Sequence, residues 1–490
     1  MISDEIQIRV TEDEIKKLKL LEEADTVPLT SNKPLIQKVP SSLCSCYSQR
    51  ECRRYFKPIS VAIGPLSHRK KTKTDLRFEG VEKWKSRLAA MFIKSSRGTA
   101  LDFYENVKKK IYSLRECYNF KGGQKWTDEN LAWMFLVDGC ALLHFIILDA
   151  NGVWEKFRVE NGLVCIEKID IFLLENQLPY QLLEILIDSF VEFSPVELRQ
   201  ERRKSFKKYI TEFVNRIFWS LIAPEQHQIH VDHSQPRLSH EQQEEEEEED
   251  PVHLLDLLRR RLMGVKLKKN GNNPERFNEA GSLETLLKEA KSEEQPSISI
   301  CNVKELKEKG ILFKARKKVD AITDIDFNYR CCMPTLTLAP ISLPNTTMPL
   351  LLNLMAYELC SDFKEDRKIT SYLSFLDSLI DNGEDVKELR EAGVLHHGLG
   401  SDEAVAKLFN KISRILVPKL ERDSILRRNI HEYCSNKSHP RYLYASTVAK
   451  LTDTYFRSPW SFVVFLVALV GLIMTAMEVY YSFEGISDPY

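Results

Sequence analysis

Helical periodicity runs through most of the N-terminal half of the chain. From about Arg77 to Arg115, apolar positions recur at spacings of three and four residues, which predicts a helical stretch with one buried face. The segment Leu131–Leu148 is apolar on nearly every side, so we expect a helix buried in the middle of a domain. Further helices are predicted at about 170–193, interrupted by Pro179, and at 196–222. By contrast, the prolines between Lys33 and Arg69 predict loops.

The pattern changes in the second half. Between Ile311 and Leu343, polar and apolar positions alternate and β-branched residues gather, which predicts two or three strands. Helices are predicted again at about 350–361, 369–382, 385–392, 401–417 and 421–435. A last helix begins near Tyr442. The expected fold class is therefore mainly α: a helical globular body with a small β-strand region near 311–343 and one C-terminal transmembrane helix.

The segment Ser458–Met477 holds twenty residues without a charge. A helix of that length covers roughly 30 Å, the thickness of the hydrocarbon core of a bilayer. Aromatic residues, which favour the membrane interface, stand at both of its edges. We therefore predict a membrane span at 458–477. The side chains expected to face lipid are those of Trp460, Phe462, Phe465, Leu469, Leu472 and Met474.

The charges around this span predict its orientation. The tail after Met477 contains three acids and no Lys or Arg, whereas Arg441, Lys450 and Arg457 precede the span. Because positive charge stays on the cytoplasmic side, the N-terminal body is expected in the cytosol, at the plasma membrane or an endomembrane. The N-terminus shows no apolar signal-peptide core. The expectation is a single-pass, tail-anchored protein.

Composition shifts divide the chain into five predicted regions. The run Glu241–Asp250 is almost purely acidic, and such a block repels itself and buries no surface, which favours disorder. Two interpretations stay open for it: a solvated linker, or a docking tail for a basic partner. The regions are a polar segment (1–32), a helical subdomain (33–223), a largely disordered linker with one short helix at 252–262 (224–297), an α+β subdomain (298–440), and a juxtamembrane helix, span and tail (441–490).

Composition also excludes some classes of function. The formal net charge is −1, whereas a dedicated nucleic-acid binder shows a basic domain. The eleven cysteines form no paired framework, which favours reduced thiols in the cytosol. Cys44, Cys46, Cys52 and His68 have a spacing that fits none of the usual zinc patterns. No metal, cofactor or small-molecule ligand is therefore expected.

Motifs for catalysis are absent from the sequence, including Gly-rich phosphate loops, HExxH and GxSxG. The adjacent His396 and His397 precede a glycine and are expected to be exposed in a loop. Asp138 and Glu175 lie in strongly apolar segments, and acids are seldom buried there unless they are paired. They are either structural or a carboxylate pair for acid–base chemistry. We predict no catalytic residue, keep these two acids as the candidates, and lean against an enzyme.

Many short segments in one order carry a family resemblance. They are Val39-Pro40, Ile63-Gly64-Pro65, VDGCALL at 137–143, IDIFLLENQLPYQLLE at 169–184, HLLDLLR at 253–259, LKEKGILF at 306–313, MAYELC at 355–360, ITSYLSFLDSLI at 369–380, LGSDEAVAKLFNKI at 399–412 and YFRSPW at 455–460. Together they make the chain resemble the plant family called Domain of Unknown Function 247. The chain departs from the family pattern after Pro65, where GPYHHG is common, and at His144, where an acid is common.

This resemblance implies a largely helical protein with one C-terminal transmembrane helix and no assigned activity. Some grass members of the family are implicated in self-incompatibility. The expected function is that of a membrane-anchored recognition or scaffold protein that acts through contacts with other proteins, including its own relatives. The alternatives are a hydrolase-type enzyme that uses the buried carboxylates, and an organelle tether with a passive domain. The loops at Gly64–Arg77 and Pro224–Ser297 are the expected variable surfaces.

Overall fold

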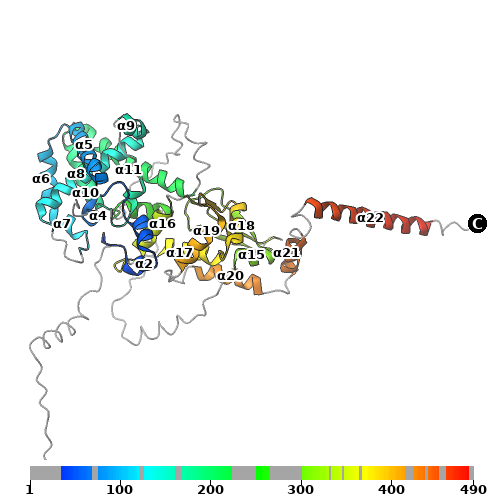
Figure 1. Cartoon of the computed structure of the whole chain (residues 1–490). Coiled ribbons are helices and arrows are strands. Elements are labelled where there is room, and N and C mark those ends of the chain that lie inside the picture. Colours follow the sequence, from blue (N-terminus) through cyan, green and yellow to red (C-terminus); the bar gives the residue numbers. More distant parts are fainter. Residues whose placement is uncertain are drawn as a thin grey trace, which may run out of the picture.

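The structure is a computed structural model (Figure 1). It describes residues 35–68, 76–120, 126–160, 168–222, 250–264, 301–329, 333–344, 347–363, 367–413, 423–435, 440–451 and 459–484. Helices dominate these ranges and a few short strands accompany them, so the predicted fold class is confirmed. Most of the predicted linker, including 241–249 of the acidic run, lies outside the described residues.

Short and long helices alternate in the N-terminal half. They are α2 (Ser41–Ser45), α3 (Gln49–Phe56), α4 (Gly64–Ser67), α5 (Leu76–Ser96), α6 (Ala100–Lys109), α7 (Ile111–Glu116), α8 (Asp128–Ala150), α9 (Trp154–Glu160), the 3₁₀ helix η1 (Lys168–Phe172), α10 (Tyr180–Glu192) and α11 (Val196–Ile222).

Three predictions for this half were wrong in detail. The 33–69 region holds three helices instead of loops alone. The 77–115 stretch is three helices, broken where Arg97 adopts a positive φ of 72°. Pro179 caps the start of α10 instead of interrupting a longer helix.

Helix α8 is the centre of this half, as its apolar sequence predicted. The Thr127 hydroxyl accepts the backbone N–H of Asn130 at 3.3 Å and so caps the helix start. Neighbours α5, α6, α10 and α11 pack around it. Side chains on several faces are buried, among them Phe135, Cys140 and Ile146. A helix covered on nearly every side needs no polar face, which explains why its periodicity is weak.

The second half combines helices with two small sheets. Its elements are α13 (Leu254–Leu262), α15 (Val303–Glu308), β1 (Leu312–Ala315), β2 (Asp326–Asn328), β3 (Thr335–Leu338), β4 (Ile341–Leu343), α16 (Thr347–Glu358), α17 (Lys368–Leu379), α18 (Gly383–Glu391), β5 (Leu395–His397), α19 (Asp402–Ser413), α20 (Asp423–Ser435) and α21 (Pro440–Leu451). The first sheet has the order β1-β3-β2, with β1 parallel and β2 antiparallel to β3. In the second sheet, β4 pairs in parallel with β5. The histidine pair therefore lies in a strand, and the prediction of a loop was wrong.

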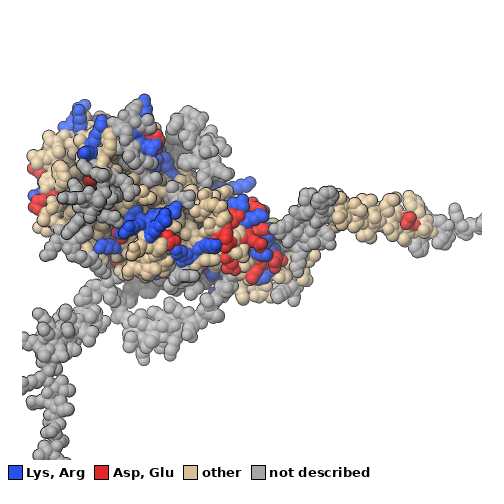
Figure 2. Space-filling model, viewed as in Figure 1, with Lys and Arg blue, Asp and Glu red and all other residues tan. Residues whose placement is uncertain are grey.

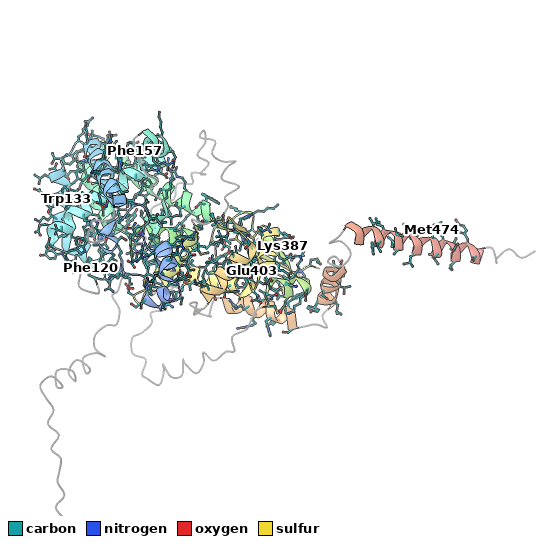
Figure 3. All side chains as sticks on the ribbon, viewed as in Figure 1. Phe120, Trp133, Phe157, Lys387, Glu403 and Met474 are labelled. Atoms are coloured by element: carbon teal, nitrogen blue, oxygen red, sulfur yellow. The ribbon has the colours of Figure 1, made fainter. Side chains whose placement is uncertain are left out.

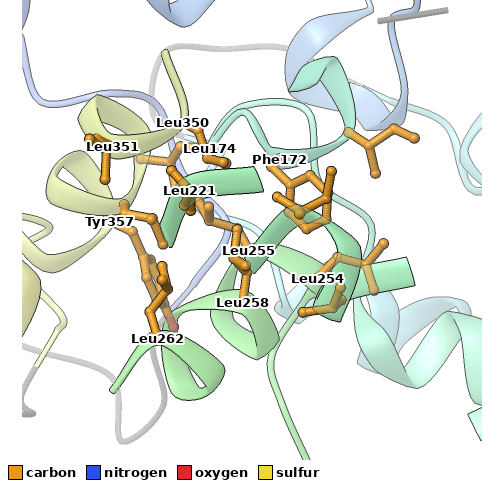
Figure 4. Close-up of a cluster of buried hydrophobic side chains, with 14 of the residues drawn as sticks. Phe172, Leu174, Leu221, Leu254, Leu255, Leu258, Leu262, Leu350, Leu351 and Tyr357 are labelled. Carbon is orange, nitrogen blue, oxygen red and sulfur yellow. The ribbon is translucent and has the colours of Figure 1, made fainter. Parts of the chain in front are cut away.

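One continuous hydrophobic core joins the two halves. Figure 4 shows the part where α13 meets η1, α11 and α16. Leu255 and Leu258 of α13 are fully buried there, together with Phe172 of η1 and Leu221 of α11. Helix α13 therefore packs against elements on both sides of it in the sequence.

Helix α22 (Pro459–Glu484) extends away from this body (Figure 1). Its stretch Val463–Ser482 has a mean hydropathy of 2.3 and is 0% buried. Helix α8 has a similar mean hydropathy of 2.1 but is 72% buried, which is what a core helix of a soluble body shows. Helix α22 is thus long and apolar enough to cross a membrane, and the body does not cover it.

Candidate functional site

Asp138, the first candidate acid, lies on the buried face of α8 and pairs with Lys85 of α5. The Lys85 ammonium donates to Asp138 Oδ1 at 2.7 Å, and the two side chains are 3% and 2% exposed. The other carboxylate oxygen, Oδ2, accepts the backbone N–H of Gly64 at 3.0 Å. Both oxygens of Asp138 are therefore engaged within the protein.

The ammonium group of Lys85 also has a full set of hydrogen-bond acceptors. Its ammonium also donates to the carbonyl oxygen of Ala62 at 2.8 Å and to Glu82 at 2.7 Å, so three acceptors match its three protons. Burial by itself lowers the pKa of Lys85, but the negative charges of Asp138 and Glu82 outweigh burial and raise it. Lys85 is consequently charged at neutral pH and neutralises Asp138.

Glu175, the second candidate, lies in the loop between η1 and α10. Its Oε1 accepts the backbone N–H of Val39 at 3.1 Å, and its Oε2 accepts the ammonium of Lys57. The glutamate side chain is 6% exposed and that of Lys57 is 35% exposed. Asp138 and Glu175 thus have separate cationic partners, and no interaction between the two acids is found among the described residues.

Both acids bind the same N-terminal segment, residues 35–68, and so does a third acid that the sequence analysis did not single out. Asp170 of η1 accepts the backbone N–H groups of Ile59, Ser60 and Val61 at 2.7–3.1 Å. Asp170 stands in the same apolar run as Glu175, so the signal that identified Glu175 also marked Asp170. The three carboxylates act as clamps for backbone donors of this segment, and the donors of Val39, Val61 and Gly64, which belong to buried residues, would otherwise lack partners.

The neighbouring amides complete this clamp. Asn176 accepts the N–H of Ile63 at 2.8 Å and donates to the carbonyl of Val61 at 3.0 Å. Gln177 accepts the N–H of Leu255 at 3.1 Å, and so ties the same loop to α13. The triplet Glu175-Asn176-Gln177 thus joins its own loop to residues 35–68 and to α13, two segments that are far from it in the chain. The sequence analysis did not anticipate this junction.

A second buried ion pair joins α13 to α16. The Arg259 Nε donates to Glu358 Oε1 at 2.8 Å, with the two side chains 1% and 0% exposed. The guanidinium also lies 4.4 Å from the ring centroid of Phe363. Glu358 accepts the backbone N–H and the hydroxyl of Thr370 at 2.8 and 2.7 Å. The charged groups of Arg259 and Glu358 therefore find their partners inside the protein as well.

The cysteine and histidine candidates are dispersed. Cys44 Sγ lies 2.8 Å from Cys52 Sγ, whereas Cys46 contacts the carbonyl of Ser42 and His68 packs edge-on against Trp126. Burial and the neighbouring Cys52 raise the pKa of Cys44 to about 12, which keeps its thiol protonated. Among the described residues, no group of three or more His, Cys, Asp or Glu side chains is placed to hold a metal ion.

His397 and His144 lie in separate surroundings. His397 Nε2 lies 2.6 Å from Asp402 Oδ1, and Arg390 donates to the same carboxylate at 2.9 Å. The Arg390 guanidinium lowers the pKa of Asp402. Burial lowers the pKa of His144 to about 4, so that ring is neutral. Neither ring nitrogen of His144 makes a hydrogen bond among the described residues, so His144 does not pair with Asp138.

Charge and apolar surface are distributed unevenly over the outside. Lys and Arg gather on the face over α2 and α16, and acidic side chains gather at the end of the body near α15 and α18 (Figure 2). Lys387 and Glu403 belong to that end, and Met474 projects from α22 far from it (Figure 3). Of the predicted lipid-facing residues, Leu469, Leu472 and Met474 are 43%, 70% and 64% exposed, and Phe465 is half-buried. The side chains of Trp460 and Phe462 lie outside the described residues.

Comparisons with known proteins place the chain among plant sequences. The model of a family described as plant protein of unknown function, DUF247, matches residues 36–474. A UPF0481 protein of Arabidopsis thaliana is 26% identical over 445 residues, which cover 86% of this chain and 82% of that protein. A second UPF0481 protein of the same plant is 22% identical over 431 residues, or 77% and 78% of the two chains. No solved structure matches.

Proposed function

Because the chain belongs to the plant family Domain of Unknown Function 247, which is described as plant protein of unknown function, we propose that it is a single-pass membrane protein whose helical body binds other proteins. The body acts as a recognition or scaffold unit on the cytosolic face. The membrane holds it at a high local concentration, so that weak contacts combine into stable assembly.

The observation that carries the proposal is the exposure of α22. In water, its stretch Val463–Ser482 would leave a continuous apolar surface unburied on every side. Burying one Val, Leu or Met side chain is worth about 1.5–3 kcal/mol, so a helix of this length gains far more from a bilayer than from solvent. Among the described residues, the body leaves this stretch uncovered, whereas it covers most of α8.

The carboxylate geometry disfavours catalysis by Asp138 and Glu175. A general acid or base must lie within hydrogen-bond reach of its substrate. The side chains of Asp138 and Glu175 are 2% and 6% exposed, and each accepts hydrogen bonds from its own lysine and from one backbone N–H group. These contacts favour a structural role for the two acids.

Exposed aromatic side chains supply candidate contacts for partners. Tyr112 of α7 and Trp133 of α8 are 74% and 61% exposed, and Figure 3 shows Trp133 at the outer edge of the body. Tyr and Trp are enriched in protein–protein interfaces, where they carry much of the binding energy. We propose these two residues as first targets for substitution.

Carbonate extraction and protease protection of the full chain in plant microsomes test the membrane part. We expect the chain to stay in the carbonate-washed pellet, with its body accessible to protease from the cytosolic side. Replacing Leu469 and Leu472 by Arg costs about 2.5–3.5 kcal/mol each at a bilayer centre and should release the chain. A Leu443→Arg change on α21, which is 54% exposed, is the matched control and should not. A wild-type chain washed into the supernatant would reject the proposal.

Proximity labelling from the intact chain tests the recognition part. We expect a defined set of neighbouring proteins, and Tyr112→Ala with Trp133→Ala should lose some of them while the chain stays in the membrane. A labelling pattern that matches that of the isolated span alone would contradict a recognition role for the body.

A further inference from the structure

Two cysteine thiols meet where α2 joins α3. Cys44 Sγ of α2 lies 2.8 Å from Cys52 Sγ of α3. Both residues are free thiols and both are partly exposed, so a small solute can reach them from water. A disulfide bond is about 2.05 Å long, which is only about 0.8 Å less than this separation. The two sulfurs are therefore already close to bonding distance.

Contacts at both ends hold α3 in place. At its start, Ser48 and Glu51 form a capping box, and Glu51 accepts the ammonium of Lys411 at 2.6 Å. Directly after its end, Lys57 donates to Glu175. These contacts tie α3 to α19 and to the loop between η1 and α10, so the position of Cys52 is set by the folded body.

Helix α2 is held by its neighbours as well. Leu43 is fully buried, and the Val39 N–H just before the helix donates to Glu175 Oε1 at 3.1 Å. The backbone N–H of Cys44 itself donates to the carbonyl of Pro40 at 3.2 Å. The two thiols thus face each other because the fold positions both helices. Groups that are oriented in this way react much faster than groups that meet by diffusion.

The two sulfurs are suited to different steps of an oxidation. Cys44 keeps its proton, because burial and the neighbouring Cys52 raise its pKa to about 12. The thiolate is the form that attacks an oxidant, so Cys52 is the sulfur that reacts first. Redox-sensitive cysteines are often placed beside a second, resolving cysteine, and Cys44 lies where such a resolving thiol must lie.

We propose that Cys44 and Cys52 are an oxidation site, at which a peroxide converts the two thiols into a reversible disulfide. The Cys52 thiolate attacks hydrogen peroxide, which leaves a sulfenic acid on Cys52 and releases hydroxide. This hydroxide takes up the proton that Cys52 has lost. The Cys44 sulfur then attacks the Cys52 sulfur, the S–O bond breaks, and the oxygen leaves as water with the Cys44 proton. Together the thiols lose two electrons, the peroxide becomes two waters, and an added dithiol reverses the reaction.

Peptide mapping of the full chain in plant microsomes tests this site. The membranes are exposed to increasing hydrogen peroxide, the remaining thiols are blocked with N-ethylmaleimide, and the chain is digested with trypsin. Because Arg50 lies between the two cysteines, trypsin separates them, and only a disulfide keeps the two peptides together. We expect the linked peptides to appear and to vanish after treatment with dithiothreitol. Their yield should exceed that from the urea-unfolded chain at the same dose by about tenfold.

Cys46 provides the matched control, since it lies in the same tryptic peptide as Cys44 but contacts the carbonyl of Ser42. Cys46→Ser should leave the linkage unchanged. Cys44→Ser should abolish it and leave the sulfenic acid on Cys52, which dimedone traps. A linkage that survives Cys44→Ser, or no linkage at doses that oxidise Cys46, would overturn the proposal. Equal yields from the folded and the unfolded chain would overturn it as well.

The thiol pair belongs to the helical body, so its oxidation does not depend on the membrane span. A chain that carbonate releases from the membrane should form the same linkage.

Discussion

The ammonium of Lys85 lies 2.7 Å from a carboxylate oxygen of Asp138, and both side chains are at most 3% exposed. The two residues are 53 positions apart and join α5 to α8 at the centre of the N-terminal half. A buried pair of this kind is stable only while both charges are present, because a single buried charge keeps the cost of lost hydration without a partner.

Removing one member of this pair should therefore be costly. We expect Asp138→Asn to destabilise the body by about 3–5 kcal/mol, since it leaves the Lys85 charge short of a counter-ion. The double change Lys85→Met with Asp138→Asn should cost less than the sum of the two single changes. Thermal unfolding of the full chain in detergent, followed by circular dichroism, measures these differences.

Glu82→Gln provides the control for this cycle, because Glu82 also contacts Lys85 but is 37% exposed. An exposed partner contributes about 0–1 kcal/mol, so its loss should be hardly visible. If Asp138→Asn folds as stably as Glu82→Gln, the buried pair is not what holds α5 to α8.

Glu175→Gln should loosen the N-terminal segment more than it lowers global stability. Gln keeps one acceptor for the Val39 N–H but loses the charge that binds Lys57. We expect a loss of about 1–3 kcal/mol and faster proteolysis within residues 35–68. Mass spectrometry of the early fragments measures this effect. Cleavage that begins elsewhere, at an unchanged rate in 35–68, would show that Glu175 is not a clamp.

Features visible in local patterns were predictable. The apolar run of α8 and the uncharged run of α22 both predicted helices, and both segments are helical in the structure. The capping box in which Ser48 and Glu51 bond each other was also readable, and it marks the start of α3, where loops were expected.

Features that depend on distant partners were not predictable. Nothing near Asp138 in sequence identifies Lys85 as its counter-ion. Residues 395–397 become a strand only because β4 pairs with them, 54 positions earlier in the chain. Such pairings are set by tertiary packing, which overrides local propensity.

Gly64→Ala should be strongly destabilising. Gly64 has a φ of +71°, and a Cβ there would lie 2.7 Å from the backbone oxygen of Gln177. Backbone atoms cannot yield as a side chain can, and the positive φ adds strain for any L-residue. We expect a loss of more than about 1 kcal/mol in the free energy of unfolding, measured by denaturant titration.

Gly80→Ala is the matched control. Gly80 lies in α5, and no described atom outside its chain neighbours and the backbone of its own helix lies within 4 Å of an added Cβ. Alanine should stabilise this helix by about 0.5–1 kcal/mol. Equal effects of the two changes would mean that the Gln177 contact does not restrict Gly64.

Mild acid should destabilise the body through His253. Its Nδ1 accepts the N–H of Asp256 at 3.1 Å, so the fully buried ring caps α13 in its neutral form. Burial lowers the pKa of His253 from 6.5 to about 4. The unfolded chain therefore binds a proton near pH 6.5, which the folded chain binds only near pH 4. Stability should be complete above about pH 6.5 and fall by up to about 3 kcal/mol towards pH 4.

His253→Asn separates this effect from other acid-sensitive groups. Asn is a good cap and does not titrate, so the variant should lose less stability between pH 6.5 and 4 than the wild type. His144, whose pKa burial also lowers to about 4, should supply a further part of the acid sensitivity, and His144→Gln should reduce that part. Unfolding by denaturant at a series of pH values gives both slopes. If the stability of the His253→Asn variant falls with pH as steeply as that of the wild type, His253 does not contribute to the acid sensitivity. Helix α13 would then stay bound to the body when this ring is protonated.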